Sequence, residues 1–428
     1  MAALHSRIWT RTITTMKLVR AMFLAALGTV LFAQAPEPWQ EPLTRRHWDE
    51  AEPLLKQALE QKETVAGLRG LATVYRATGR LAAADPLLER VVVLDESVAN
   101  VEDLAKVKVA LPNLRRAEEL YRRSLYLRTQ SGEDEVNSIV THQRLAQILV
   151  GAGKYAEAEA EAVTAMTIRM RKLGADHPDL AGDVSIAARI YQVEKKFAEA
   201  AASWETVVSI QEGAFGIDDL KLAPSLQSLA TCRQELGHLP LAEAALRRAL
   251  AIREANQGPI QVEVAQLLDE LGRLLFDSQR FAEAEPVYRR SLTTWARLVG
   301  PGNSLLASSY DSLAVVLASL TRYPEAEELY RKALTLRDQD DLDSLHNLTL
   351  VLEAQEKYKD AEPVYRRALA IVDVPNPEDT GKLAELLSGY AGVLRQLKRP
   401  AEAARIDARL KGLPQPAPPK APPVAAKQ

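Results

Sequence analysis

The sequence predicts an all-α protein built as an array of stacked helical hairpins. Ala, Leu, Glu and Arg dominate the 428 residues, while aromatic residues make up only 5%, and this balance favours helix over sheet. Similar phrases also return along the chain, as in RFAEAEPVYRRSL at 280–292 and KYKDAEPVYRRAL at 357–369. Repeats at such a period are typical of solenoids, in which each unit buries its apolar face only against its neighbours.

The first element, MKLVRAMFLAALGTVLFAQA at 16–35, has the pattern of a bacterial secretory signal peptide. Its apolar run from Ala21 to Ala33 is shorter than the ~20 residues of a membrane-spanning helix. We therefore expect a start at Met16, cleavage after Ala33, and a mature chain without a membrane span in the periplasm or outside the cell. A mitochondrial presequence and an uncleaved membrane anchor are the alternatives.

Residues 34–47 follow the signal peptide of 1–33 and contain PEPWQEPLTRRH. This stretch is too short and too rich in proline for a first helix, so the sequence predicts a linker. The solenoid is expected over 48–411, and the segment from Trp48 to Glu60 is expected to pack as a lone capping helix.

An aromatic or apolar residue opens each repeated phrase, and we call it the anchor. Most anchors are 42 residues apart, and the first intervals are 33. The anchors are Trp48, Leu81, Leu114, Tyr155, Phe197, Leu239, Phe281, Tyr323, Tyr358 and Pro400. Apolar residues follow each anchor at helical spacing and precede it likewise, so each unit is expected to be a pair of helices.

Two positions in the repeat are occupied by small residues, as is needed where two helices approach closely. Alanine stands three residues after every anchor: Ala51, Ala84, Ala117, Ala158, Ala200, Ala242, Ala284, Ala326, Ala361 and Ala403. Nine residues before nine of the anchors stand Ala72, Ala105, Ala146, Ala188, Ala230, Gly272, Ala314, Thr349 and Ala391.

These positions resemble the tetratricopeptide repeat (TPR), and the 42-residue form resembles the kinesin-light-chain subtype. GKYAEAEAEAVTAMTIRMRKLGADHPDLA at 153–181 is the nearest single match. The resemblance covers 48–410 and implies a right-handed α-α superhelix of about nine hairpins plus a leading capping helix. The resemblance points to one specific fold but says little about the function.

Glycine and proline mark the expected helix boundaries. Gly132, Gly174, Gly216, Gly258 and Gly300 recur every 42 residues, as left-handed residues after a helix end would. Prolines at 53, 86, 286 and 363, which follow an AE or AD pair, are expected to be tolerated if the second helix begins near the anchor. The Pro-rich segment 412–428 is expected to be an extended, disordered tail.

Composition and spacing exclude several kinds of chemistry. Removing 1–33, which holds four basic and no acidic residues, leaves 50 basic against 57 acidic residues, a net charge of about −7. This argues against nucleic-acid binding. One cysteine and six scattered histidines provide neither a disulfide framework nor a metal cluster, so no cofactor or metal is expected.

Local motifs have plainer explanations than catalysis. LVGAGKY at 149–155 and DQDDLDS at 338–344 lack required phosphate-loop and calcium-loop residues. Each repeated Arg-Arg pair has a Glu four residues before its first Arg, so a salt-bridged solvent face is expected. Cys232 is expected to be a buried small apolar residue.

The resemblance places ligand-binding residues on the first helix of each hairpin, which lines the concave surface in this family. The matching residues are Gln143, Ser185, Gln227, Asp269, Asp311, His346 and Ser388, with Arg273 and Asn347 beside them. The Lys and Asn pair by which related members hold a peptide's carboxylate is absent, so a C-terminal ligand is not supported. Ordinary hydration of these residues is an equal alternative.

The sequence therefore predicts an exported, non-enzymatic scaffold that binds a protein or peptide along the concave face. An envelope hydrolase or transferase using groove carboxylates is one alternative. A purely structural subunit of a cell-envelope complex is another.

Overall fold

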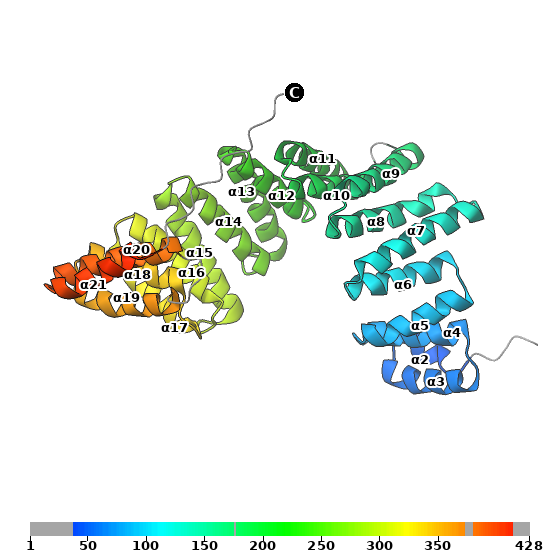
Figure 1. Cartoon of the computed structure of the whole chain (residues 1–428). Coiled ribbons are helices and arrows are strands. Elements are labelled where there is room, and N and C mark those ends of the chain that lie inside the picture. The colour runs from blue at the N-terminus through cyan, green and yellow to red at the C-terminus, as the bar shows by residue number, and fades with distance from the viewer. Residues whose placement is uncertain (1–36, 175–176, 373–379, 414–428) are drawn as a thin grey trace, which may run out of the picture. The chain divides into compact units, whose positions relative to one another are not determined.

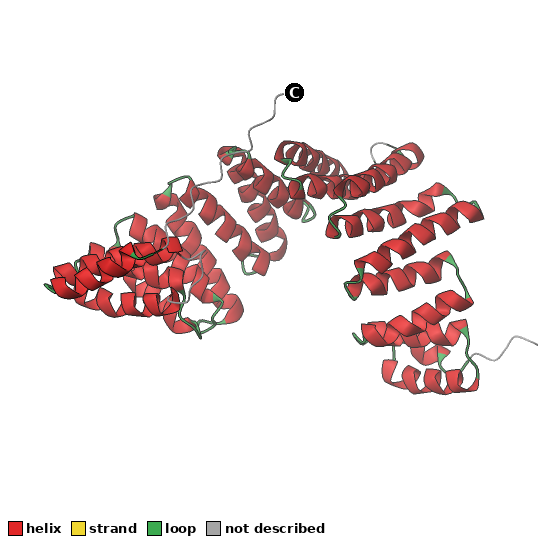
Figure 2. Ribbon diagram, viewed as in Figure 1, coloured by secondary structure: helices red, strands yellow, loops and turns green. Residues whose placement is uncertain are grey.

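The computed structural model describes residues 37–174, 177–372 and 380–413. The predicted signal peptide at 1–33 and the predicted tail from residue 414 onward lie outside the described residues. Within those ranges every regular element is helical (Figure 2). The predicted all-α class is confirmed.

The chain divides into two compact units, residues 1–168 (unit 1) and 169–428 (unit 2). Unit 1 contains α2 (Gln40–Thr44), α3 (Trp48–Gln61), α4 (Val65–Ala77), α5 (Leu81–Leu94), α6 (Val98–Ala110), α7 (Leu114–Ser131), the 3-10 helix η1 (Glu135–Ser138), α8 (Ile139–Gly151) and most of α9 (Tyr155–Leu173).

Unit 2 continues the same alternation of helices (Figure 1). Its helices are α10 (Leu180–Val193), α11 (Phe197–Phe215), α12 (Leu222–Glu235), α13 (Leu239–Gln257), α14 (Val262–Asp277), α15 (Phe281–Val299), α16 (Leu306–Ser319), α17 (Tyr323–Leu336), α18 (Leu342–Ala354), α19 (Tyr358–Val372), α20 (Thr380–Gln396) and α21 (Pro400–Lys411). In the described part of the chain α4 to α21 make nine consecutive hairpins. Within each unit the packing follows chain order, with α12 on α13 and α13 on α14.

Each of the ten anchors is the first residue of a helix, from Trp48 of α3 to Pro400 of α21. The first helix of a hairpin ends a few residues before the anchor, and the second begins on it. The register read from the sequence therefore locates the start of every second helix.

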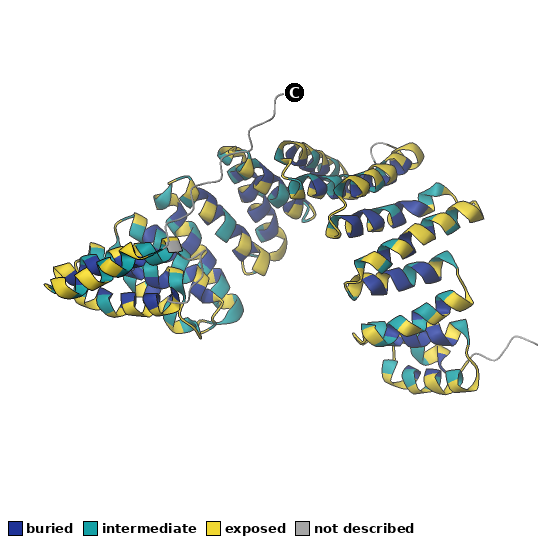
Figure 3. Ribbon diagram, in the orientation of Figure 1, coloured by how far each residue is buried: buried dark blue, intermediate teal, exposed yellow. Residues whose placement is uncertain are grey.

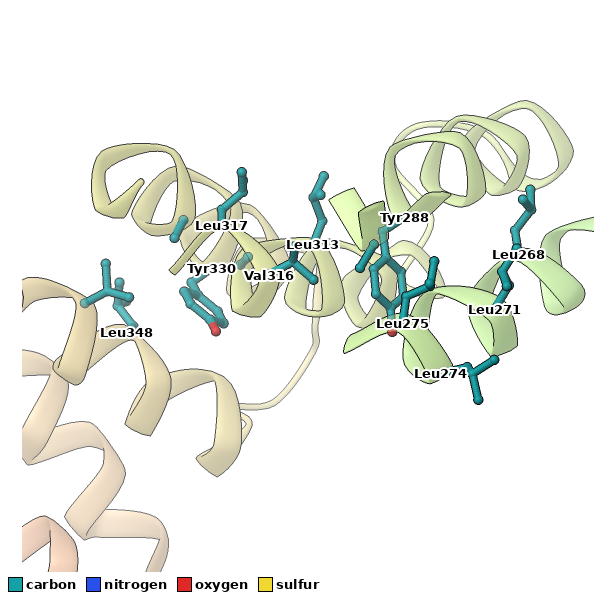
Figure 4. Close-up of a cluster of buried hydrophobic side chains, with 14 of the residues drawn as sticks. Leu268, Leu271, Leu274, Leu275, Tyr288, Leu313, Val316, Leu317, Tyr330 and Leu348 are labelled. Carbon is teal, nitrogen blue, oxygen red and sulfur yellow. The ribbon is translucent and has the colours of Figure 1, made fainter. Parts of the chain in front are cut away.

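The small positions are places of close approach between helices. The alanine three residues after each anchor is 0% or 1% exposed, and so are the small residues on the first helices, as with Ala230 and Ala314. Large buried rings such as Tyr288 and Tyr330 lie among the leucines of the core of unit 2 (Figure 4). A Cβ on Gly272 would lie 2.8 Å from Cζ of Tyr288, so this glycine makes room for the ring. In Figure 3, buried residues lie along the side of each helix that packs on other helices, and exposed residues lie along the other side.

The turn inside each hairpin has a feature that the sequence did not predict. The residue two before each anchor has a positive φ in all ten cases. Glycine fills this place at Gly79, Gly153 and Gly237, but Thr321 adopts it at φ 60° and Lys398 at φ 60°. Left-handed backbone disfavours residues with a Cβ, so packing of the two helices holds these turns against a local cost.

The predicted linker at 34–47 is partly helical, which corrects the expectation of a lone capping helix. Residues Gln40–Thr44 form α2, which packs on α3. Trp39 is only 6% exposed and belongs to an apolar cluster with Leu55 and Leu71. Burial of this indole offsets the weak helix propensity of a short, Pro-rich segment.

The repeated glycines after the second helices differ in part from the prediction. Gly132 is left-handed, with φ 67° and ψ 26°. Gly216, Gly258 and Gly300 also have positive φ, but their ψ values lie between 150° and 168°. That extended region is essentially restricted to glycine. After Gly216 and Gly300 the chain forms a turn, in which Asp219 and Asn303 donate to the glycine carbonyls, instead of a left-handed cap.

The repeated prolines lie deeper in their helices than the sequence argument required. Each is the sixth residue of its helix, beyond the four N–H groups that lack an internal partner. The carbonyl four residues earlier therefore loses its helical donor. Those earlier residues and the prolines themselves are all exposed, so water can satisfy the carbonyl.

Candidate functional site

The candidate site is the solvent side of the first helices, which we call the first-helix face of each unit. Two of its predicted residues are strongly engaged within the fold. Asp269 accepts hydrogen bonds from the Ser291 hydroxyl and, at 2.8 Å, from Trp295 Nε1. Asp311 accepts from Ser344 at 2.9 Å and pairs with Arg337 at 2.6 Å. These carboxylates join a first helix to its own second helix or to the next hairpin.

Glu102 of unit 1 occupies the same register and shows the same arrangement. Its Oε1 accepts from Ser124 and Thr141 at 2.7 Å and from Arg128 at 3.0 Å. Arg128, Trp295 and Arg337 each stand fourteen residues after an anchor. An acid at this first-helix position is therefore held wherever that later position carries a donor.

Burial dominates the electrostatics of the two held aspartates. It raises the pKa of Asp269 above its ordinary value, against the hydrogen bonds from Ser291 and Trp295. It also raises the pKa of Asp311, although Arg337 acts in the opposite direction. One oxygen of Asp311, Oδ1, is buried without a hydrogen-bond partner.

The other predicted residues are placed less uniformly. Gln227 donates at 2.6 Å to Glu270 on the next first helix, and Ser185 donates at 2.8 Å to the Gly182 carbonyl in its own helix. Gln143 and Asn347 are half-buried, whereas Arg273 and Ser388 are exposed.

His346 and Ser388 are the predicted residues that the structure brings into one hollow. This hollow of about 580 Å³ opens between α18 and α20 of unit 2. Leu350, Glu353 and Glu385 line it as well. Nδ1 of His346 is buried there without a hydrogen-bond partner, and Leu350 is 50% exposed.

Two further hollows open on unit 1, and most of their lining comes from the hairpins before α8, which the predicted set did not include. One of about 820 Å³ is lined by Arg69, Asp103 and Arg128, and one of about 260 Å³ by Val109 and Arg144, while Lys106 belongs to both. Arg69 and Glu102 occupy the register of the predicted set. Extending the register to the shorter repeats would have found them.

The Arg-Arg pairs lie on the second helices, and the predicted i, i+4 pairing is confirmed. Arg122 pairs with Glu118, Arg247 with Glu243, Arg289 with Glu285 and Arg366 with Glu362.

The glutamates at this repeat position also form an ion pair with a basic residue of the next hairpin, which the sequence did not predict. That base is the residue immediately before the next anchor, and its nitrogen lies 2.5 to 2.8 Å from the carboxylate. The pairs are Glu52 with Arg80, Glu118 with Lys154, Glu243 with Arg280, Glu285 with Arg322, Glu327 with Lys357 and Glu362 with Arg399. We call this set the forward ladder. A hydrogen bond from Arg80 lowers the pKa of Glu52 to about 2.

The second Arg of a pair reaches back to an acid at or beyond the end of the preceding second helix. Arg123 meets Glu96 at 2.7 Å, Arg248 meets Glu212 at 2.5 Å, Arg290 meets Glu254, and Arg367 meets Asp340. Arg90, which follows Glu89 and not another Arg, meets Glu63 at 2.8 Å in the same way. The repeated phrase thus meets the next hairpin through its glutamate and the preceding hairpin through its second Arg.

The described residues offer little that is typical of a catalytic or metal site. Cys232 is fully buried in an apolar cluster with Trp204, and burial raises the pKa of its thiol to about 11. Over the described ranges, no three His, Cys, Asp or Glu side chains are placed to share a metal ion. No described helix combines the length and apolarity needed to cross a membrane.

Sequence comparison decides the family. Models described as tetratricopeptide repeat match 43–99, 143–179, 185–255, 263–339 and 344–380, together well over half of the chain. The chain is a tetratricopeptide-repeat protein. No protein in a search of curated proteins matches it.

Solved structures with similar repeats include two of the kinesin-light-chain kind. One, from Podosopora anserina, is assigned as a kinesin light chain with nearly identical TPR-like repeats; it is 21% identical, with 47% of this chain and 95% of that chain covered and a TM-score of 0.43. The other is BtubC (BKLC) from P. vanneervenii, 20% identical, with 64% and 96% covered and a TM-score of 0.41. TPR proteins of this fold generally mediate protein–protein interactions.

Proposed function

We propose that this TPR protein is an exported, non-enzymatic scaffold that binds a protein or peptide partner on its first-helix faces. The observation that carries the proposal is the placement of hollows. Each of the three opens between hairpins, and each takes its lining from more than one helix. Open hollows that cross repeats suit an extended polypeptide better than a small substrate.

The engaged acids also favour binding over catalysis. The carboxylates of Asp269 and Asp311, two of the groove acids that the hydrolase alternative could use, are committed to donors within the fold. Export rests on the signal-peptide pattern at 16–35, and the 42-residue period supports a kinesin-light-chain-like subtype.

Site-specific photo-crosslinking in cells tests this function. A benzophenone amino acid replaces Arg144, Arg273 or Ser388, which are exposed on first helices, or Glu199 or Glu328, which are exposed on second helices. We expect protein adducts from the first three positions and few from the other two. Adducts only from the second-helix positions would point to the structural-subunit alternative. Fractionation of the same cells tests export, and a chain confined to the cytosol would contradict it.

A further inference from the structure

The first helices of the two units carry opposite charge balances. In unit 1, α4, α6 and α8 hold five Lys and Arg residues against two Asp and Glu. In unit 2, the first helices from α10 to α20 hold five basic residues against ten acidic. The whole chain is close to balanced, with 54 basic and 57 acidic residues. The excess of acid on unit 2 is therefore a property of that face.

Many of the bases on this face are already paired, while several acids are not. Lys382 pairs with Asp343, Arg395 with Asp407, and Arg233 with Glu205. By contrast, no basic side chain of the described residues forms an ion pair with Glu235, Glu270, Asp277, Glu353 or Glu385. The face therefore presents carboxylates without an ion-pair partner among the described residues.

One of these acids is held at an electrostatic cost. Burial raises the pKa of Glu270, although Gln227 donates to it and Arg273 lies near enough to act in the opposite direction. A carboxylate that is partly removed from water and forms no ion pair gains more from an incoming cation than an exposed one does.

The hollow between α18 and α20 combines this acidity with apolar surface. Glu353 accepts a hydrogen bond from the hydroxyl of the buried Tyr365, which fixes its carboxylate, and Glu385 is exposed. Leu350, half exposed, and Leu410 from α21 supply apolar surface to the same hollow. An apolar side chain flanked by cations would match it.

We propose that the first-helix face of unit 2 is a docking surface for a basic polypeptide segment, which places an apolar side chain in the hollow of Leu350, Glu353 and Glu385. This inference rests on the proposed binding function and names the charge of the partner at that site. Lys or Arg residues of the segment pair with Glu353 and Glu385, and others follow the face toward Asp277 and Glu270. Charge complementarity of this kind steers association, so binding weakens as ionic strength rises.

Binding of three labelled dodecapeptides to the full chain tests the proposal by fluorescence anisotropy. One alternates Lys with Leu and Gly, one has Glu in place of Lys, and one has Gln. We expect the Lys peptide to bind most tightly. Replacing Glu353→Gln together with Glu385→Gln should weaken it about tenfold, the equivalent of two partly exposed ion pairs. Leu350→Ser should weaken the Lys and Gln peptides alike.

A charge-matched control separates the site from bulk electrostatics. Glu60→Gln with Glu199→Gln removes the same charge from exposed positions on second-type helices, and affinity should then change less than about twofold. Circular dichroism melting confirms that each variant is folded. Equal losses in the two double variants would overturn the proposal. If the Glu peptide bound to the first-helix face more tightly than the Lys peptide, the proposed charge of the partner would be wrong, but the scaffold function would still hold. Absence of binding by all three peptides would also overturn the proposal, while crosslinking decides the function independently.

Discussion

At the residue scale, the array depends on pairs in which one side chain is small because its neighbour is large. Gly272 faces the ring of Tyr288, and Gly389 faces Tyr365. Both rings are almost fully buried. Protein interiors are close-packed, so an added methyl group at such a contact must displace something. The repeat is thus specified by volume as much as by polarity.

Two glycines of α20 give a matched test of this packing. Alanine at Gly389 would bring its Cβ to 2.9 Å from Cζ of Tyr365, whose hydroxyl is held by Glu353. We expect Gly389→Ala to lower the free energy of unfolding by about 1–3 kcal/mol. Gly392 has no atom within 4 Å of such a Cβ. Gly392→Ala should therefore raise that free energy by about 0.5–1 kcal/mol, the usual helical gain. Urea unfolding measures both, and equal effects would contradict the packing argument.

At the element scale, hairpins are joined by two kinds of acidic group with opposite electrostatic character. The glutamates of the forward ladder lie on second helices and are paired with bases from two hairpins. Burial raises the pKa of Glu285, but Arg289 and Arg322 outweigh it and leave the pKa below its ordinary value. Asp269 on a first helix has only neutral donors, and its pKa is raised. The two groups should respond to pH in opposite directions.

Unfolding measured between pH 3 and pH 7 checks this contrast. The stabilisation by Glu285 is fully present above its ordinary pKa of 4.5 and is lost as pH falls through the lower folded value. Glu285→Gln should cost roughly 1–2 kcal/mol at pH 7 and progressively less in acid. The unfolded chain releases the Asp269 proton near the ordinary pKa of 3.8, whereas the folded chain keeps it to higher pH, so the contribution of Asp269 to stability falls as pH rises past 3.8. The free energy of unfolding of Asp269→Asn should therefore increase relative to that of the wild type over the same rise in pH. Parallel pH profiles for the two variants would refute the assignment.

At the scale of the whole molecule, the helices within each unit pack mainly on their neighbours in chain order, as α12 on α13 and α13 on α14. Stability in such an array is close to a sum of local terms and neighbour terms. Damage in one hairpin should therefore stay near that hairpin instead of unfolding the chain cooperatively.

Hydrogen exchange on Ala242→Leu tests this locality. Ala242 is fully buried in α13, so leucine there forces α12 and α13 apart. We expect faster amide exchange in α12, α13 and α14, and unchanged protection in α4 to α7. Exchange that accelerates throughout the chain would show that the array unfolds as one cooperative body.

The sequence was sufficient to place the helices, because anchors and small residues repeat at fixed intervals and packing demands them at every hairpin. It was less informative about the first-helix face. Whether Asp269 or Asp311 faces solvent depends on a donor fourteen residues past the next anchor, Trp295 or Arg337, and no single-position pattern reveals that partner. The helix at Gln40–Thr44 escaped prediction because burial of Trp39, a tertiary effect, forms it.

The forward ladder has a consequence for how such a gene can change. From α13 to α19 each second helix carries its glutamate, and the base that meets it is the last residue before the next anchor. Excision of residues 281–322, one full period, would bring Arg280 directly before Tyr323 and leave Glu243 with its arginine. Duplication of the same segment would add one matched pair. Recombination at other intervals would leave a glutamate without its base. The forward ladder therefore favours the gain and loss of whole repeats.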